Sequence, residues 1–110
     1  APGNFKYLEN KLDLFLISPD LKNKEDIAFL KVGNLDKLFP KEAENIITKS
    51  FKNRNFLITD NFLEVINFKK IIIISSLGFT KKEELIDIKN KLIFHQKQPI
   101  GIISLKNYIN

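Results

Sequence analysis

The residues of this chain that could take part in chemistry are few, and the first of them ends an apolar run. Asp60 closes the run NFLITD. A carboxylate at the carboxyl end of a parallel strand can hold a magnesium ion or its water shell. The alternative is that Asp60 and Asn61 cap a following helical turn. Taken by itself, the residue favours the capping interpretation.

A second group of candidates follows the run KIIIISS. Ser75, Ser76, Gly78 and Thr80 could line a ligand crevice beside a helix N-terminus, which attracts anions. The same residues could instead form a plain connection between a strand and a helix, in which Gly78 takes a positive φ. Together with Asp60, these four are the candidate cofactor-binding residues of the sequence.

Catalytic and metal sites lack the partners they need. His95 is the only histidine, and Lys91, at helical spacing from it, is not a metal ligand, so we expect His95 to complete the last turn of a helix. Glu83 and Glu84 are adjacent and point apart on a helix, so they form no catalytic pair. The absence of cysteine excludes disulfides and thiolate metal sites. We therefore predict no catalytic residue and no metal ligand.

Glycine-rich phosphate loops are also absent. Neither G-x-x-x-x-G-K-[ST] nor G-x-G-x-x-G occurs, and the four glycines are never clustered. Because such loops need glycine to bring backbone amides close to phosphate, we predict no nucleotide cofactor.

Length and charge set the class of protein. The 110 residues, 44% hydrophobic and 28% charged, suit one folded domain. We expect residues 1–4 to be a cloning remnant or the edge of an excised fragment, and residues 5–110 to form a single α/β domain. The net charge of +5 comes almost entirely from lysine, since Arg54 is the only arginine. Readers of nucleic acid rely on arginine, so we expect no specific nucleic acid partner, whereas mild attraction to an anionic membrane surface is allowed.

Short apolar runs predict the strands, which are residues 12–18, 55–60, 70–76 and 99–105. The third contains four consecutive isoleucines, which place apolar side chains on both faces of a sheet. That strand therefore belongs in the middle of the sheet.

Helices are predicted between these strands, over residues 24–32, about 40–52, a single turn within 62–68, and 80–96. In the last helix, Thr80 and Glu83 match a capping box, and Asp87 and Lys91 are spaced to pair. Its predicted buried face consists of Leu85, Ile86, Ile88, Leu92 and Ile93. A strand, a helix and a strand in this order form a βαβ unit, so we expect an α/β domain of three layers with a mostly parallel sheet.

The order and spacing of these segments resemble the later portion of the P-loop tyrosine autokinases of bacterial capsule and exopolysaccharide export, which are fused to or partnered with chain-length determinant proteins. In that family, an LDLLPAG-type strand is followed by a DxVIIDTPP segment, a VILVVRxGxT strand with a helix after its threonine, and a PVLGVVLN strand. The corresponding segments here are residues 12–18, 55–60, 62–85 and 98–107. Gly78, Thr80 and Gly101 stand at the family's glycine, threonine and last glycine.

This chain also departs from the family pattern. The family's phosphate loop and first magnesium-binding aspartate have no counterpart here, and its tyrosine cluster is reduced to Tyr108. Asp60 stands at the aspartate of the second acidic motif, but Asn61 and Phe62 replace the prolines after it. The resemblance therefore implies a P-loop ATPase-like, or Rossmann-like, half that lacks its phosphate loop.

The function implied by this resemblance is a non-catalytic, kinase-like interaction or regulatory domain of a polysaccharide chain-length or export protein. It would lie in the cytoplasm or at the cytoplasmic face of the inner membrane. Its partners would be further copies of itself or membrane proteins of the export complex. Two alternatives stay open: a fragment of a nucleotide-binding ATPase or tyrosine kinase whose phosphate loop lies upstream, and a basic nucleic-acid-binding module.

Overall fold

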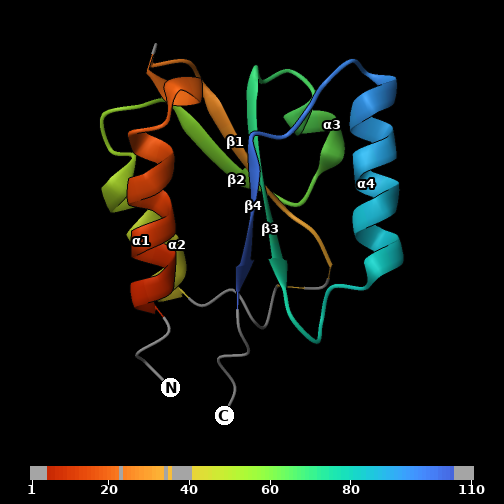
Figure 1. The fold of residues 1–110 in the computed structure, drawn as a ribbon, viewed down its shortest axis with the longest axis horizontal. Coiled ribbons are helices and arrows are strands. Elements are labelled where there is room, and N and C mark those ends of the chain that lie inside the picture. Colours follow the sequence, from red (N-terminus) through yellow and green to blue (C-terminus); the bar gives the residue numbers. More distant parts are fainter. Residues whose placement is uncertain (1–4, 23, 34, 36–40, 106–110) are drawn as a thin grey trace.

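A parallel sheet forms the middle layer of the structure. The structure is a computed structural model and describes residues 5–22, 24–33, 35 and 41–105. The sheet has four strands in the order β2-β1-β3-β4, and all neighbours are parallel (Figure 1). The strands are β1 (Ile27–Lys31), β2 (Phe56–Thr59), β3 (Lys70–Ser76) and β4 (Gly101–Leu105). The predicted α/β class and parallel sheet are thus confirmed.

Helices cover both faces of this sheet (Figure 1). One face carries α1 (Phe5–Leu16) and α2 (Lys41–Ser50), and the other carries α3 (Phe62–Val65) and α4 (Lys82–Phe94). A short 3-10 helix, η2 (Pro19–Leu21), follows α1. The three predicted layers are therefore present, and β3, α4 and β4 form the predicted βαβ unit.

Strand β3 lies between β1 and β4, as its isoleucines predicted. All four of residues 71–74 are fully buried. Because side chains alternate, Ile72 and Ile74 enter the core beneath α1 and α2, while Ile71 and Ile73 enter the core beneath α4. Each fully buried isoleucine stabilises the fold by about 1.5–3 kcal/mol.

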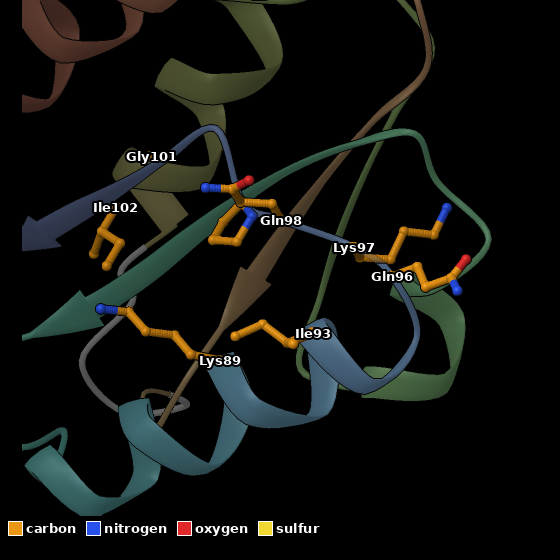
Figure 2. A pocket seen from close by; sticks show the side chains of 8 residues that line it. Lys89, Ile93, Gln96, Lys97, Gln98, Gly101 and Ile102 are labelled. Atoms are coloured by element: carbon orange, nitrogen blue, oxygen red, sulfur yellow. The ribbon is translucent and has the colours of Figure 1, made fainter.

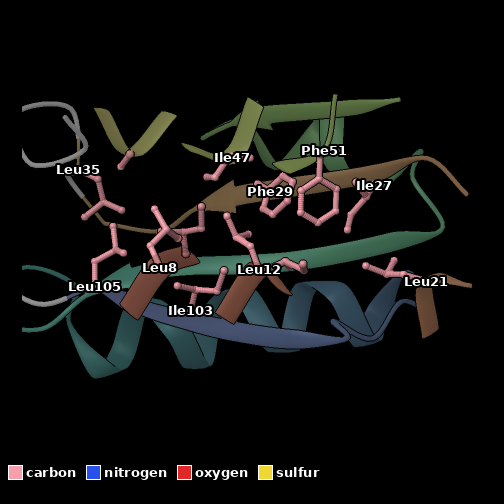
Figure 3. Packing of buried hydrophobic residues seen from close by; sticks show 13 residues of the cluster. Leu8, Leu12, Leu21, Ile27, Phe29, Leu35, Ile47, Phe51, Ile103 and Leu105 are labelled. Carbon is pink, nitrogen blue, oxygen red and sulfur yellow. The ribbon is translucent and has the colours of Figure 1, made fainter. Parts of the chain in front are cut away.

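The larger core lies between the sheet and the pair α1 and α2 (Figure 3). Leu8 and Leu12 of α1 point into it, and Phe29 of β1 meets Phe51 edge to face with ring centroids 5.1 Å apart. Such aromatic pairs contribute about 0.5–1.5 kcal/mol beyond the area they bury. These residues hold α1 and α2 against the same face of the sheet.

The prediction of a strand over residues 12–18 is wrong, because most of this segment lies in helix α1. The alternation in LDLFL resembles a strand, but it is the end of a longer helical pattern that starts at Phe5. Leu8, Leu12 and Phe15 follow at spacings of three and four, which is the helical period, and all three face the core.

The prediction of a helix over residues 24–32 is also wrong, because strand β1 occupies its apolar part. Ile27, Ala28, Phe29 and Leu30 are buried in succession. Consecutive apolar residues fill both faces of a sheet, and β1 is paired with a strand on each side. The strand ends before Gly33, which has a positive φ of 94°.

Helix α4 was predicted correctly in place but not in every detail. It begins after Lys81 rather than at Thr80, and the carboxylate that reaches back belongs to Glu84 rather than Glu83. Asp87 and Lys91 form the expected ion pair at 3.0 Å.

The buried face of α4 is narrower than predicted. Leu92 is fully buried and Leu85 and Ile88 pack beside it, whereas Ile86 and Ile93 are 47% and 66% exposed. Two of the five side chains predicted to be buried are therefore left outside the core.

The remaining elements agree with prediction. The predicted helix over residues 40–52 contains α2, the strand 55–60 contains β2, the turn within 62–68 contains α3, and the strand 99–105 contains β4. The predicted start of the helix at about residue 40, where we also expect proline to break the preceding apolar stripe, lies outside the described residues. No helix of the described chain is long and apolar enough to cross a membrane.

Candidate functional site

The carboxyl edge of the sheet contains the point where a ligand would be expected in this fold. From β1 the chain passes to β2 on one side and then returns to β3 on the other side. Ligands of open α/β sheets bind at such a switch point, between the two loops that leave the neighbouring strands. Here these loops begin with Val32 and Gly33 after β1 and with Leu77 after β3.

Thr80 joins the two loops across the switch point. Its hydroxyl donates a hydrogen bond to the carbonyl oxygen of Val32 at 2.7 Å and accepts one from the amide of Ser76 at 2.9 Å. The amide of Thr80 in turn donates to the carbonyl oxygen of Ser76 at 2.8 Å. One side chain thus satisfies backbone groups of both strands and draws their ends together.

Gly33 allows this close approach. A Cβ atom at this position would lie 2.8 Å from Thr80 Oγ1 and 3.1 Å from Thr80 Cα, and the φ of 94° is itself costly for other residues. A side chain at this position would collide with Thr80, so glycine is what lets the two loops meet.

The other residues of the predicted crevice lie around this link. Ser75 and Ser76 are buried in β3, with 4% of each exposed. Gly78 has a φ of 88° and no neighbour within 4 Å of the position of a Cβ. Its conformation, and not a close contact, is what requires glycine. The structure therefore brings Ser76, Gly78 and Thr80 into one turn. The hydroxyl of Thr80 is already engaged in the hydrogen bonds that stabilise this turn.

Asp60 lies apart from this turn, after β2 and therefore two strands away from β3. It is exposed and lines a hollow of about 310 Å³ together with Val32 and Gly33 of the loop after β1, with Glu84 and Asp87 of α4, and with Lys31. Three carboxylates against one lysine make this hollow unfavourable for a phosphate. Within the described part of the chain, no group of three histidine, cysteine, aspartate or glutamate side chains could hold a metal ion.

Asn61, rather than Asp60, caps α3. Its side-chain oxygen accepts a hydrogen bond from the amide of Leu63 at 3.0 Å. Thr59 supports the same turn, because its hydroxyl accepts from the amide of Asn61 and donates to the carboxylate of Glu64. The capping interpretation of this segment is thus confirmed, and of the two residues it named Asn61 supplies the cap.

The N-terminus of α4, which follows the predicted crevice residues, already interacts with carboxylates of its own first turn. The carboxylate of Glu84 accepts a hydrogen bond from the amide of Lys81 at 3.0 Å, and Glu83 lies in the same turn of α4. Glu42 and Glu44 occupy the first turn of α2. Carboxylates at these positions use the positive ends of the helix dipoles and repel a further anion.

His95 stands where the sequence placed it, at the C-terminal end of α4. Its amide donates to the carbonyl oxygen of Lys91 at 3.2 Å, and its ring lies 5.6 Å from that of Phe62, between centroids. The residue ends the helix, as expected.

Sequence reasoning missed the partners of Thr80, which are Gly33 and the carbonyl group of Val32. It had placed both at the end of a helix, so they had no reason to approach the loop after β3. A recognisable signal was present, because a glycine that directly follows a buried apolar run commonly marks a strand end with a positive φ.

Comparison of the chain with models of known families, with curated proteins and with solved structures finds no match.

Proposed function

We propose that this chain is a non-catalytic interaction domain of a bacterial polysaccharide chain-length or export protein, which acts by contact with other proteins and not by turnover of a nucleotide. The observation that carries the proposal is the hydroxyl of Thr80, which bridges the strand ends at the switch point with hydrogen bonds of 2.7 and 2.9 Å. A bridge at that place ties together the two loops between which this class of fold binds its ligands.

Electrostatics supports the same proposal. Glu83 and Glu84 occupy the N-terminal turn of α4, and Asp60, Glu84 and Asp87 line the hollow at the switch point with one lysine, Lys31. A nucleoside triphosphate carries several negative charges and would meet three carboxylates and one lysine there, where a kinase offers amides, a lysine and magnesium ions.

The resemblance on which the biological setting depends loses its first segment, because residues 12–18 lie mostly in helix α1. The segments that still support this setting are residues 55–60, 62–85 and 98–107, which contain β2, then α3 and β3, and then β4 in the expected order.

The first test is nucleotide binding. We expect about 5 mM MgATP to leave the thermal midpoint of the full chain unchanged. A dissociation constant of about 50 µM would stabilise the fold by about 2.7 kcal/mol and raise the midpoint by roughly 10 °C or more. Such an increase, lost in an Asp60→Ala variant that unfolds normally without ATP, would refute the non-catalytic assignment.

The second test addresses the biological setting. Replacing residues 27–105 in the parent gene with a flexible linker is expected to change the length distribution of a surface polysaccharide on a gel. The Thr80→Ser variant, which keeps the hydroxyl, serves as the matched control and should preserve that distribution. An unchanged distribution after replacement would exclude a role in chain-length control.

A further inference from the structure

The edge strand β4 offers backbone groups for pairing. Among the described residues it is paired only with β3. Its sequence, GIISL, contains neither a charged residue nor proline, the two features that commonly protect an edge from further pairing. An unprotected, apolar edge of this kind is suited to binding an added strand.

A groove runs along one flank of this edge, between α4 and β4 (Figure 2). Its volume is about 670 Å³, and Ile93, Lys89 and Ile102 point into it. Ile86 lies one heptad before Ile93 on α4, so Ile86, Lys89 and Ile93 form one exposed stripe. The groove lining includes Lys89 and Lys97 but no acidic residue.

Helix α1 provides a similar stripe on the other flank. The ring of Phe15 lies against Gly101 of β4 and orients the helix toward this edge. Lys11 is four residues before Phe15, and Tyr7 and Leu14 adjoin it at helical spacing, so all three share one side of α1. This side is opposite to Glu9 and Asp13, which line a hollow with α2, so it faces away from α2. Tyr7 and Leu14 are 39% and 60% exposed, and Lys11 Nζ lies 6.0 Å from the centre of the Tyr7 ring.

The two stripes have the same pattern, in which a lysine separates two apolar side chains seven residues apart. Seven residues of helix span about 10.5 Å. In a strand, residues on one face that are four apart span about 13 Å. In a strand paired with β4, alternate side chains would point to the two flanks. The first and fifth residues could then contact the two apolar side chains of one stripe, and the third residue could contact its lysine. The second, fourth and sixth residues would face the other stripe in the same way.

Charge decides between the possible occupants of this edge. A second copy, joined edge to edge, would bring Lys11 and Lys89 toward the same lysines of its partner, since both flanks carry the same pattern. Like charges opposed across an interface weaken it. An occupant with acidic side chains in the middle and apolar ones at both ends complements both stripes.

We propose that the β4 edge binds an extended segment of a partner protein that has two adjacent acidic residues flanked on each side by two aliphatic residues. The proposal rests on the proposed function only in that the domain acts through contact. The added strand pairs with the backbone of β4. Its aliphatic side chains pack on Ile93 and Leu14, and its two carboxylates face Lys11 and Lys89.

The test uses fluorescent peptides that contain the sequence IVEEVI or its charge-reversed control IVKKVI, titrated with the full chain and followed by anisotropy. We expect saturable binding of the acidic peptide, with an affinity about tenfold higher than that of the basic peptide, because its two carboxylates attract Lys11 and Lys89 whereas the lysines of the control repel them. A tenfold difference in affinity is about 1.4 kcal/mol. A Lys11→Glu/Lys89→Glu double variant should reverse this preference. Deuterium exchange should slow at the amides of β4 when the acidic peptide is bound.

Matched substitutions identify the surface. Ile93→Asp should abolish peptide binding, whereas Phe94→Asp, on the next residue and 83% exposed, should leave it unchanged. Equal affinity for the two peptides, or binding of neither, would overturn the proposal. So would a dimer in sedimentation equilibrium that Ile93→Asp dissociates, because a second copy would then occupy the edge. None of these results depends on nucleotide binding. The peptide experiments and the nucleotide-binding test of the proposed function can therefore fail independently.

Discussion

Replacing Thr80 with valine should destabilise the domain by about 2–4 kcal/mol. Valine keeps the shape of threonine but removes the hydroxyl that donates to Val32 and accepts from Ser76. The carbonyl group of Val32 and the amide of Ser76 would then lack a hydrogen-bond partner. A buried polar group without a partner lowers the free energy of unfolding by about 1–3 kcal/mol. Both bonds are partly buried, which puts the expected sum toward the lower end.

The measurement is urea unfolding followed by circular dichroism, with Thr80→Ser as the control. Serine keeps both hydrogen bonds and loses one methyl group, so it should cost about 1 kcal/mol or less. For a domain of this size, 2 kcal/mol corresponds to a decrease in the thermal midpoint of about 8–16 °C. If the valine and serine variants unfold within about 0.5 kcal/mol of each other, Thr80 does not hold the strand ends together, and the main support for a closed switch point is lost.

Three further substitutions test the fold. Leu92→Ala should cost about 2–5 kcal/mol in urea unfolding, whereas Ile93→Ala, on the next residue, should stay within about 0.5 kcal/mol, and equal losses would contradict the narrow buried face of α4. Gly101→Ala should destabilise the chain by about 1–3 kcal/mol because its Cβ would collide with the ring of Phe15. The same substitution made in a Phe15→Leu variant should cost less. An equal cost in both backgrounds would show that this collision is not the cause. Asn61→Ala should cost about 1 kcal/mol through the lost helix cap, and thermal melts that match the parent chain would argue against this cap.

The second half of the chain could be predicted from its sequence because each signal there has a single interpretation. Four isoleucines in succession cannot form the one-sided stripe of a surface helix, and the following helix has an acidic first turn and an ion pair at the right spacing. Residues 70–105 are also close together along the chain and form one βαβ unit. Local pattern and tertiary structure therefore agree.

The first half was predicted wrongly because short apolar runs are ambiguous. LDLFL alternates like a strand over five residues, and only the extension back to Phe5 reveals the helical period. The segment KEDIAFLKV begins with charged residues typical of a helix start, although its apolar part, residues 27–30, is short and uninterrupted. Pairing on both sides of β1 decides its conformation, and that pairing involves residues far away in the sequence.

The candidate site was only partly predictable for the same reason. Ser76, Gly78 and Thr80 were found together because they are neighbours in the sequence. The bond from Thr80 to Val32 spans 48 residues and exists only because β1 and β3 are parallel neighbours, so that both end at one edge. A prediction that treated residues 24–32 as a helix had no means of bringing these groups together.

The prediction that Ile86 and Ile93 would be buried is wrong, because both lie outside the part of α4 that faces the sheet. A helix that covers one sheet needs an apolar stripe about 100° wide, which Leu85, Ile88 and Leu92 already provide. The excess apolar width lies on the side toward β4, where the sheet ends and a groove begins. Exposed apolar side chains that gather beside a groove favour a site for another chain. In the proposal made above, Lys89, which lies between them, favours an acidic partner over a second copy.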